Sequence, residues 1–315
     1  MLSGKGAGRI SARTEAAVRA AADELGYRTN VAARALRMGS ARTIGLVVPD
    51  VTHPFFGRLL RGAQAAAWQQ GYAVVLADAA NDPEWELASL AALRALTVDG
   101  YLFFRVDPPP GPPLRAVTIE AASPGMPGVR LDAAGGTRAA LAHLAELGHR
   151  RIGHLGSQVA TETFRERRDA VRAVMEDPSL HAESAFSLDA ASAAARELLG
   201  REDRPTAIFA DDDILAAGVY AAARSLGIAI PTQLSVVGFD DLELANQVEP
   251  ALTTVHVPAE EMWNAAADRL LVALSGGVAP RRTEIQVSLV VRGSTAPAPA
   301  RSARRRQPGG DISRT

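Results

Sequence analysis

From residue 43 onward, short runs of β-branched and aliphatic residues alternate with Ala-rich stretches long enough to form helices. This alternation is typical of parallel sheets whose strands are joined by crossover helices. The sequence therefore predicts an α/β protein with two similar lobes. The first has strands at 43–48, 72–77, 98–104 and 115–119 and helices near 56–70 and 83–96. The second has strands at 151–155, 181–186, 206–209 and 234–239 and helices near 163–176, 190–199, 213–226 and 258–274.

The composition excludes several classes of protein. A chain of 315 residues with 47% hydrophobic content can bury more than one core. No apolar run approaches the ~20 residues of a membrane-spanning helix, and the polar start of the chain does not resemble a signal peptide. Cysteine is absent, which excludes disulfides and thiolate metal sites and suits a reducing compartment. We expect a cytoplasmic protein with no membrane partner.

The two ends of the chain differ from the body. Residues 1–42 carry eight Lys or Arg side chains against three acidic ones, which favours contact with nucleic acid, although a solvated helix surface is the alternative. Within this segment the sequence predicts a helix from Ser11, a plausible N-cap, to Gly26. The Pro-, Ala- and Arg-rich end has no apolar period, so we predict a disordered tail at 296–315.

Three groups of residues are specific in type and spacing. Tyr27, Asn30-Val31-Ala32 and Leu36 precede a strand that ends in Val47-Val48-Pro49-Asp50, and a later strand ends in Gly238-Phe239-Asp240-Asp241. Together they resemble the lac repressor/galactose repressor family of bacterial transcription regulators over residues 8–295. The resemblance implies two flavodoxin-like, periplasmic-binding-protein-like lobes with a ligand in the cleft. It divides the chain into a headpiece remnant and hinge at 1–42, a two-lobed domain at 43–295 that binds the effector and dimerises, and the tail at 296–315.

The resemblance also concerns DNA. Members of the family open with a helix-turn-helix, and Met1–Lys5 is similar to the end of its recognition helix, so we expect a truncated headpiece with little base-specific readout. The hinge is expected to form a helix only on DNA and to wedge Leu36 into the minor groove. The resemblance implies these DNA-binding residues: Tyr27, Asn30, Ala33, Arg34, Leu36 and Arg37.

The effector site is expected at the carboxyl ends of the parallel strands, where ligands of such sheets collect. In the first lobe the resemblance points to Asp50, His53, Phe55 and Phe56, with one phenylalanine serving as a core anchor instead. In the second lobe it points to Phe164, Arg167, Asp212 and Asp240. Arg167 would grip ligand hydroxyls or a carboxylate with its planar fork, and Asp212 has helix capping as an alternative role.

No catalytic constellation appears among the nucleophile-elbow, phosphate-loop and zinc motifs, and we predict neither an enzyme nor a metal or other cofactor. The run Asp107–Pro113 replaces a family helix with prolines, which cannot donate helical hydrogen bonds. We interpret the chain as a regulator of the repressor type that binds DNA, responds to a small effector of the sugar class and forms a homodimer. The alternative is a stand-alone or periplasmic-type sugar-binding protein without specific DNA binding.

Overall fold

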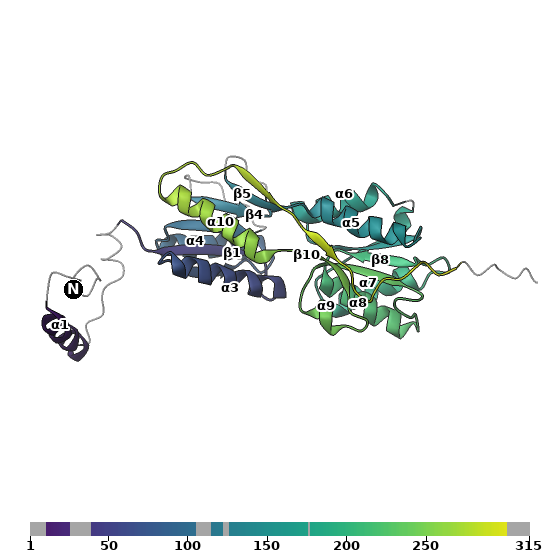
Figure 1. Cartoon of the computed structure of the whole chain (residues 1–315), viewed down its shortest axis with the longest axis horizontal. Helices are drawn as coiled ribbons and strands as arrows, with labels where there is room; N and C mark the ends of the chain where they lie inside the picture. Colours follow the sequence, from purple (N-terminus) through teal and green to yellow (C-terminus); the bar gives the residue numbers. More distant parts are fainter. Residues whose placement is uncertain (1–10, 26–38, 105–114, 122–125, 176, 301–315) are drawn as a thin grey trace, which may run out of the picture. The chain divides into compact units, whose positions relative to one another are not determined.

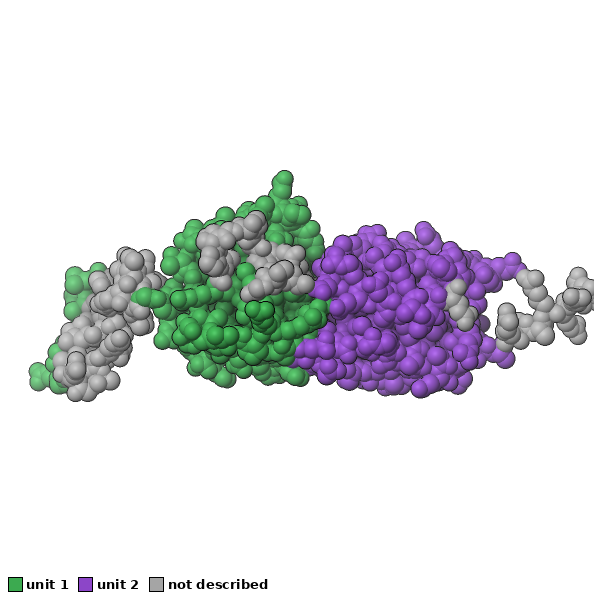
Figure 2. Space-filling view, turned by 90° about the horizontal axis from the view of Figure 1, so that it is seen from above, with its two compact units in different colours: residues 1–130, 259–283 green, residues 131–258, 284–315 purple. Residues whose placement is uncertain are grey.

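The computed structural model describes residues 11–25, 39–104, 115–121, 126–175 and 177–300. The body forms two compact units, coloured separately in Figure 2. Unit 1 consists of residues 1–130 and 259–283, and unit 2 consists of residues 131–258 and 284–315. Each unit is therefore assembled from chain segments that are distant in sequence.

The first sheet has six strands in the order β11-β5-β4-β3-β1-β2 (Figure 1). Neighbours from β5 to β2 run parallel. The strands are β1 (Thr43–Val48), β2 (Ala73–Asp78), β3 (Gly100–Phe104), β4 (Ala116–Ile119), β5 (Gly128–Leu131) and β11 (Arg282–Ile285). Helices α3 (Pro54–Gln69), α4 (Pro83–Ala95) and α10 (Ala259–Leu274) pack against it. Strands β3, β4 and β5 are buried throughout, which explains their nearly continuous apolar sequences.

The second sheet repeats this plan in the order β12-β10-β9-β8-β6-β7. Only the β10–β12 pair is antiparallel among the described pairs. The strands are β6 (Ile152–Ser157), β7 (His181–Ser184), β8 (Ala207–Ala210), β9 (Ser235–Asp240), β10 (Thr253–His256) and β12 (Ser288–Val290). The helices of this unit are α5 (Ala133–Glu146), α6 (Glu162–Arg172), α7 (Leu188–Leu199), α8 (Asp213–Ser225) and α9 (Leu244–Gln247), with a 3₁₀ turn, η1, at Pro178–Leu180.

The two-lobed α/β architecture confirms the sequence prediction, and the eight predicted strands lie within a few residues of observed ones. One assignment is wrong. The helix predicted at 258–274 in the second lobe is α10, which packs against α3, β3 and β4 of unit 1. The chain returns to the first unit after β10, and hydrophobic periodicity cannot reveal on which body a helix packs.

Both ends of the chain show local structure. Helix α1 (Ala12–Glu24) begins at the predicted cap, where the Thr14 amide donates to Ser11 Oγ over 3.2 Å. The predicted tail boundary is too early, because residues 296–300 lie against unit 2. There the Ala298 amide donates to the Leu147 carbonyl over 2.8 Å. In the described part of the chain, no helix has the length and apolarity needed to cross a membrane.

Candidate functional site

Unit 2 gathers polar side chains at the carboxyl edge of its sheet. Strands β6, β8 and β9 are parallel neighbours, so their carboxyl ends share one edge. Helix α6 follows β6 and carries Arg167, while Asp212 follows β8 and Asp240 ends β9. The structure thus brings together the three charged residues that the sequence predicts for the second lobe.

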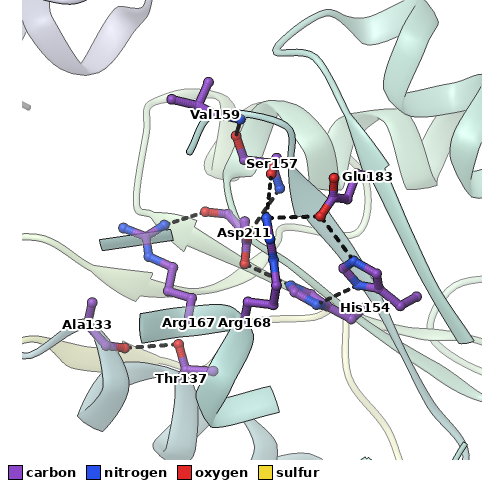
Figure 3. A network of polar contacts seen from close by, with 10 residues as sticks. Ala133, Thr137, His154, Ser157, Val159, Arg167, Arg168, Glu183 and Asp211 are labelled. Atoms are coloured by element: carbon purple, nitrogen blue, oxygen red, sulfur yellow. Dashed lines mark hydrogen bonds and ion pairs between the residues drawn. The ribbon is translucent and has the colours of Figure 1, made fainter. Parts of the chain in front are cut away.

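Arg167 is the central side chain of this edge. It is fully buried at 0% exposure, and its guanidinium carbon lies 3.5 Å from the ring centroid of Phe239 and 4.9 Å from that of Phe164. Nη1 donates to the main-chain carbonyl of Asp211 (Figure 3). Nη2 lies 3.9 Å from Asp240 Oδ1. Among the described residues, Nε and Nη2 find no hydrogen-bond acceptor. Buried donors without acceptors are costly, so these two atoms are suited to a polar ligand.

Asp240 lies in a backbone conformation that is uncommon for a residue with a side chain. Its φ is 101°, and that of Asp241 is 52°. Side chains from later segments stabilise this turn, because Asp241 pairs with Arg292 at 2.6 Å and with His256 at 2.9 Å. Such conformations often mark ligand sites, where the surrounding contacts fix them. The contacts of Asp241 therefore fix the backbone at Asp240, and with it the position of the Asp240 carboxylate at the end of β9.

The glycine of the Gly-Phe-Asp-Asp sequence has a packing reason. A Cβ on Gly238 would lie 2.3 Å from Asp213 Oδ1. The Asp213 carboxylate occupies that space because it accepts hydrogen bonds from Thr254 Oγ1 at 2.6 Å and from the Leu242 amide at 2.7 Å. Burial, reinforced by the nearby Asp212, raises the pKa of Asp213 well above its usual range. Asp213 thus has a structural role in joining α8 to β10.

The other two acids of the 211–213 run also have structural partners. Asp212 caps α8 by accepting from the Ile214 amide over 2.6 Å, which is the alternative role that the sequence offered. Asp211 accepts from the Ser157 amide and from His154 Nε2, at 2.9 and 2.8 Å. Burial opposes the charge of Asp211, but His154 and Arg167 outweigh it and lower the pKa of Asp211. A contact between Asp212 and an effector remains a prediction.

In unit 1 the predicted residues gather after β1. His53 caps α3, since its Nδ1 accepts from the Phe55 amide over 3.3 Å. Phe55 and Phe56 are both buried, with ring centroids 5.6 and 5.1 Å from that of Phe104. Asp50 accepts from the Thr52 hydroxyl over 2.6 Å. These contacts give each residue a structural role, and a role for Phe56 in stacking on an effector stays a prediction.

Two threonines near the start of α6 lie close to this site but were not predicted as site residues from the sequence. The hydroxyls of Thr161 and Thr163 are buried, and neither has a hydrogen-bond partner in the part of the chain that the structure describes. Both precede Arg167 on the segment that follows β6. The only available signal was their place after a predicted strand. The hinge residues predicted to bind DNA, from Tyr27 to Arg37, and the proline run at 107–113 lie outside the described residues.

Two α/β units, each with polar side chains at the carboxyl ends of its parallel strands, are typical of proteins that bind a small molecule. In agreement, residues 141–295 match the family described as a periplasmic binding protein-like domain.

The relatives identify the family more closely. The repressor CytR of Escherichia coli K12 is 30% identical over 91% of this chain and 89% of its own length. The regulator DegA of Bacillus subtilis is 32% identical over 92% and 91%. The solved complex of the transcriptional regulator CelR with cellobiose superposes with a TM-score of 0.72 at 30% identity, covering 92% of this chain and 93% of CelR. The chain belongs to the LacI/GalR family of bacterial transcriptional regulators.

Proposed function

We propose that the strand-end residues of unit 2 bind a sugar or a similarly hydroxylated effector, and that this effector controls binding of the protein to DNA. The proposal is carried mainly by Arg167, because its buried Nε and Nη2 donors find no acceptor in the described residues. A polar ligand that supplies oxygen atoms would satisfy both.

A hydroxylated ligand fits this edge better than a purely anionic one. Sugar hydroxyls both donate and accept hydrogen bonds, so one ligand can accept from Arg167 and donate to the nearby Asp240 carboxylate. A simple anion could satisfy only the guanidinium. Relatives support the class of ligand: CelR is solved with cellobiose, and a LacI family regulator from Enterococcus faecium is solved with ribose, with a TM-score of 0.71 at 27% identity over 81% of this chain and 99% of that one.

The DNA half of the proposal rests on the N-terminal sequence and on the family. We assign DNA contact to the hinge, with Arg34 and Arg37 positioned on phosphates and Leu36 as a wedge. We further propose that the protein acts in the cytoplasm, where its DNA is, and that it catalyses no reaction.

One experiment tests both halves. The purified protein is melted with a library of sugars, polyols and nucleosides, and each ligand that raises the melting temperature is then added to the protein bound to DNA from its own locus. We expect a ligand of the sugar class to stabilise the fold, since a ligand that binds only the folded state adds stability in proportion to RT ln(1 + [L]/Kd). The same ligand should change affinity for that DNA.

Each half can fail separately. If no compound shifts the melting temperature, the effector proposal is wrong. If a sugar binds but leaves the affinity of the protein for DNA unchanged, the alternative of a sugar-binding protein without specific DNA binding takes its place.

We also propose a homodimer, built around the β2 edge of unit 1. Strand β2 is the last strand of its sheet, and the two helices that pack beside it expose large apolar side chains. Trp68 on α3 is 81% exposed, and Trp85 on α4 is 62% exposed. Indole rings at such exposure are favoured in protein interfaces.

Sedimentation should show a dimer at micromolar concentration, and Trp85→Glu should shift it towards monomer without lowering the melting temperature of the monomer. A matched change on unit 2, Leu188→Glu, removes another exposed apolar side chain and should leave the dimer intact. A wild-type monomer at this concentration would contradict the proposal.

A further inference from the structure

A row of four titratable side chains crosses strands β8, β6 and β7 on the side of Asp211 away from Arg167 (Figure 3). Asp211 Oδ1 lies 2.8 Å from His154 Nε2, and His154 Nδ1 lies 3.0 Å from His181 Nδ1. His181 Nε2 in turn lies 3.3 Å from Glu183 Oε1. The proposed function uses Arg167 but neither histidine.

The two carboxylates fix which nitrogens carry hydrogen. A carboxylate only accepts, so the Nε2 of His154 donates to Asp211 and the Nε2 of His181 donates to Glu183. In their neutral forms, both rings then direct a lone pair from Nδ1 towards the other ring. Two lone pairs 3.0 Å apart repel each other, so the arrangement needs a cation between them, which can be a proton or a metal ion.

The ring geometry accommodates a metal ion in the gap. The ring centroids are 4.8 Å apart and the ring planes are tilted by 38°, so the two Nδ1 lone pairs can converge on one ion. Two nitrogens that are each about 2.0–2.1 Å from one zinc ion lie roughly 3 to 3.4 Å apart.

A neutral imidazole is the form that binds metal, so each Nδ1 lone pair would be available to an ion in the gap. The positive charge of Arg168 is paired with the Glu183 carboxylate, since Arg168 Nη2 lies 2.9 Å from Glu183 Oε1.

The pair borders open space. A cavity of about 330 Å³ is lined by His154, His181, Met175, Arg172 and Pro178. Met175 offers a thioether, and the remaining volume admits water as further ligands. A Cβ on the neighbouring Gly156 would approach both rings to 3.1–3.2 Å, so glycine at that position leaves the histidines room.

We propose that His154 and His181 bind one divalent transition-metal ion of the zinc class through their Nδ1 atoms. Asp211 and Glu183 orient the two rings, as carboxylates commonly do for metal-bound histidines. Water completes the coordination from the cavity. Arg172 faces the same cavity with a positive charge, which weakens binding without blocking it.

The test uses protein without a histidine tag, freed of metal by a chelator and titrated with Zn²⁺ by calorimetry and with Co²⁺ by visible absorption. We expect one ion per chain and a cobalt d–d band. His181→Ala should weaken binding at least tenfold, and its circular dichroism should match the wild type because His181 lies on β7, the edge strand of its sheet. Arg172→Gln should tighten binding severalfold, since it removes a like charge.

The matched control is His143→Gln, which changes a histidine that pairs with Thr295 instead and should leave zinc binding unaltered. Absence of both heat and a cobalt band in the folded wild type overturns the proposal. Equal zinc affinity in His181→Ala and wild type also overturns it. A histidine proton shared by the pair in NMR spectra, unaffected by stoichiometric zinc, would assign the gap to a proton and would refute the metal site.

Discussion

The Arg167→Met protein is expected to remain folded and to bind the effector about tenfold to a hundredfold more weakly than the wild type. Methionine keeps an unbranched apolar side chain beside Phe164 and Phe239, over whose rings the guanidinium lies in the wild type. It removes the donors of the guanidinium, and a charge-assisted hydrogen bond is worth roughly 1.5–3 kcal/mol, with about 1.4 kcal/mol per factor of ten in affinity. Calorimetry with the ligand found by melting measures the loss.

Arg165→Met is the matched control, because it makes the same substitution on the same helix at an exposed position. It should leave effector affinity unchanged. Asp240→Asn should also weaken binding, since the amide replaces one acceptor oxygen by a donor. If a ligand binds Arg167→Met and wild type equally, the assignment of the site at these strand ends is wrong, although the protein could still respond to that ligand elsewhere.

Much of the fold could be predicted because local sequence decides it. Runs such as Thr43–Val48 are buried strands, and caps such as Ser11 and Asp82 begin their helices where the side chain can accept an amide. The placement of α10 could not be predicted in this way. Hydrophobic periodicity shows that α10 has an apolar face but not which sheet it covers, and its packing on unit 1 follows from the path of the chain after β10.

For the candidate site, the common location of the charged side chains could be predicted, but their individual contacts could not. Parallel strands place Arg167, Asp212 and Asp240 at one edge, and that follows from sequence. The capping roles of His53 and Asp212 depend on local turn geometry, which spacing alone does not give. The buried threonine hydroxyls near the start of α6 lack any signal beyond their position.

The contact between His154 and His181 could not be predicted from the sequence for a different reason. His154 and His181 are 27 residues apart, and they meet because β6 and β7 pair in a register that sets them opposite each other. In the sequence, His154 and His181 lie in two separate predicted strands, at 151–155 and 181–186. Strand order and register are set by the whole sheet, so a contact of this kind becomes visible only in the folded unit.

Gly218→Ala is expected to destabilise unit 2 by about 1–2 kcal/mol. Gly218 lies in α8 where this helix crosses α7, and a Cβ there would lie 2.3 Å from Ala191 Cβ and 2.8 Å from the Ala191 carbonyl carbon. Overpacking of this kind typically costs about 1–3 kcal/mol, because the helices must move apart. The helix propensity of alanine, about 1 kcal/mol better than that of glycine, offsets only part of it.

The same substitution at Gly62 provides the control and separates the two effects. Gly62 lies within α3, and outside the neighbouring backbone of that helix no described atom lies within 4 Å of the Cβ that would be added. Gly62→Ala should therefore raise the midpoint of urea unfolding while Gly218→Ala lowers it. Adding Ala191→Gly to Gly218→Ala removes the nearest methyl group but leaves the main-chain atoms of Ala191 and Ser192 within 3 Å, so stability should recover only in part. Equal midpoints of urea unfolding for Gly218→Ala and wild type would show that α7 and α8 can move apart at no cost. Full recovery of the midpoint in the double variant would show that the contact between the two methyl groups alone sets the spacing of the helices.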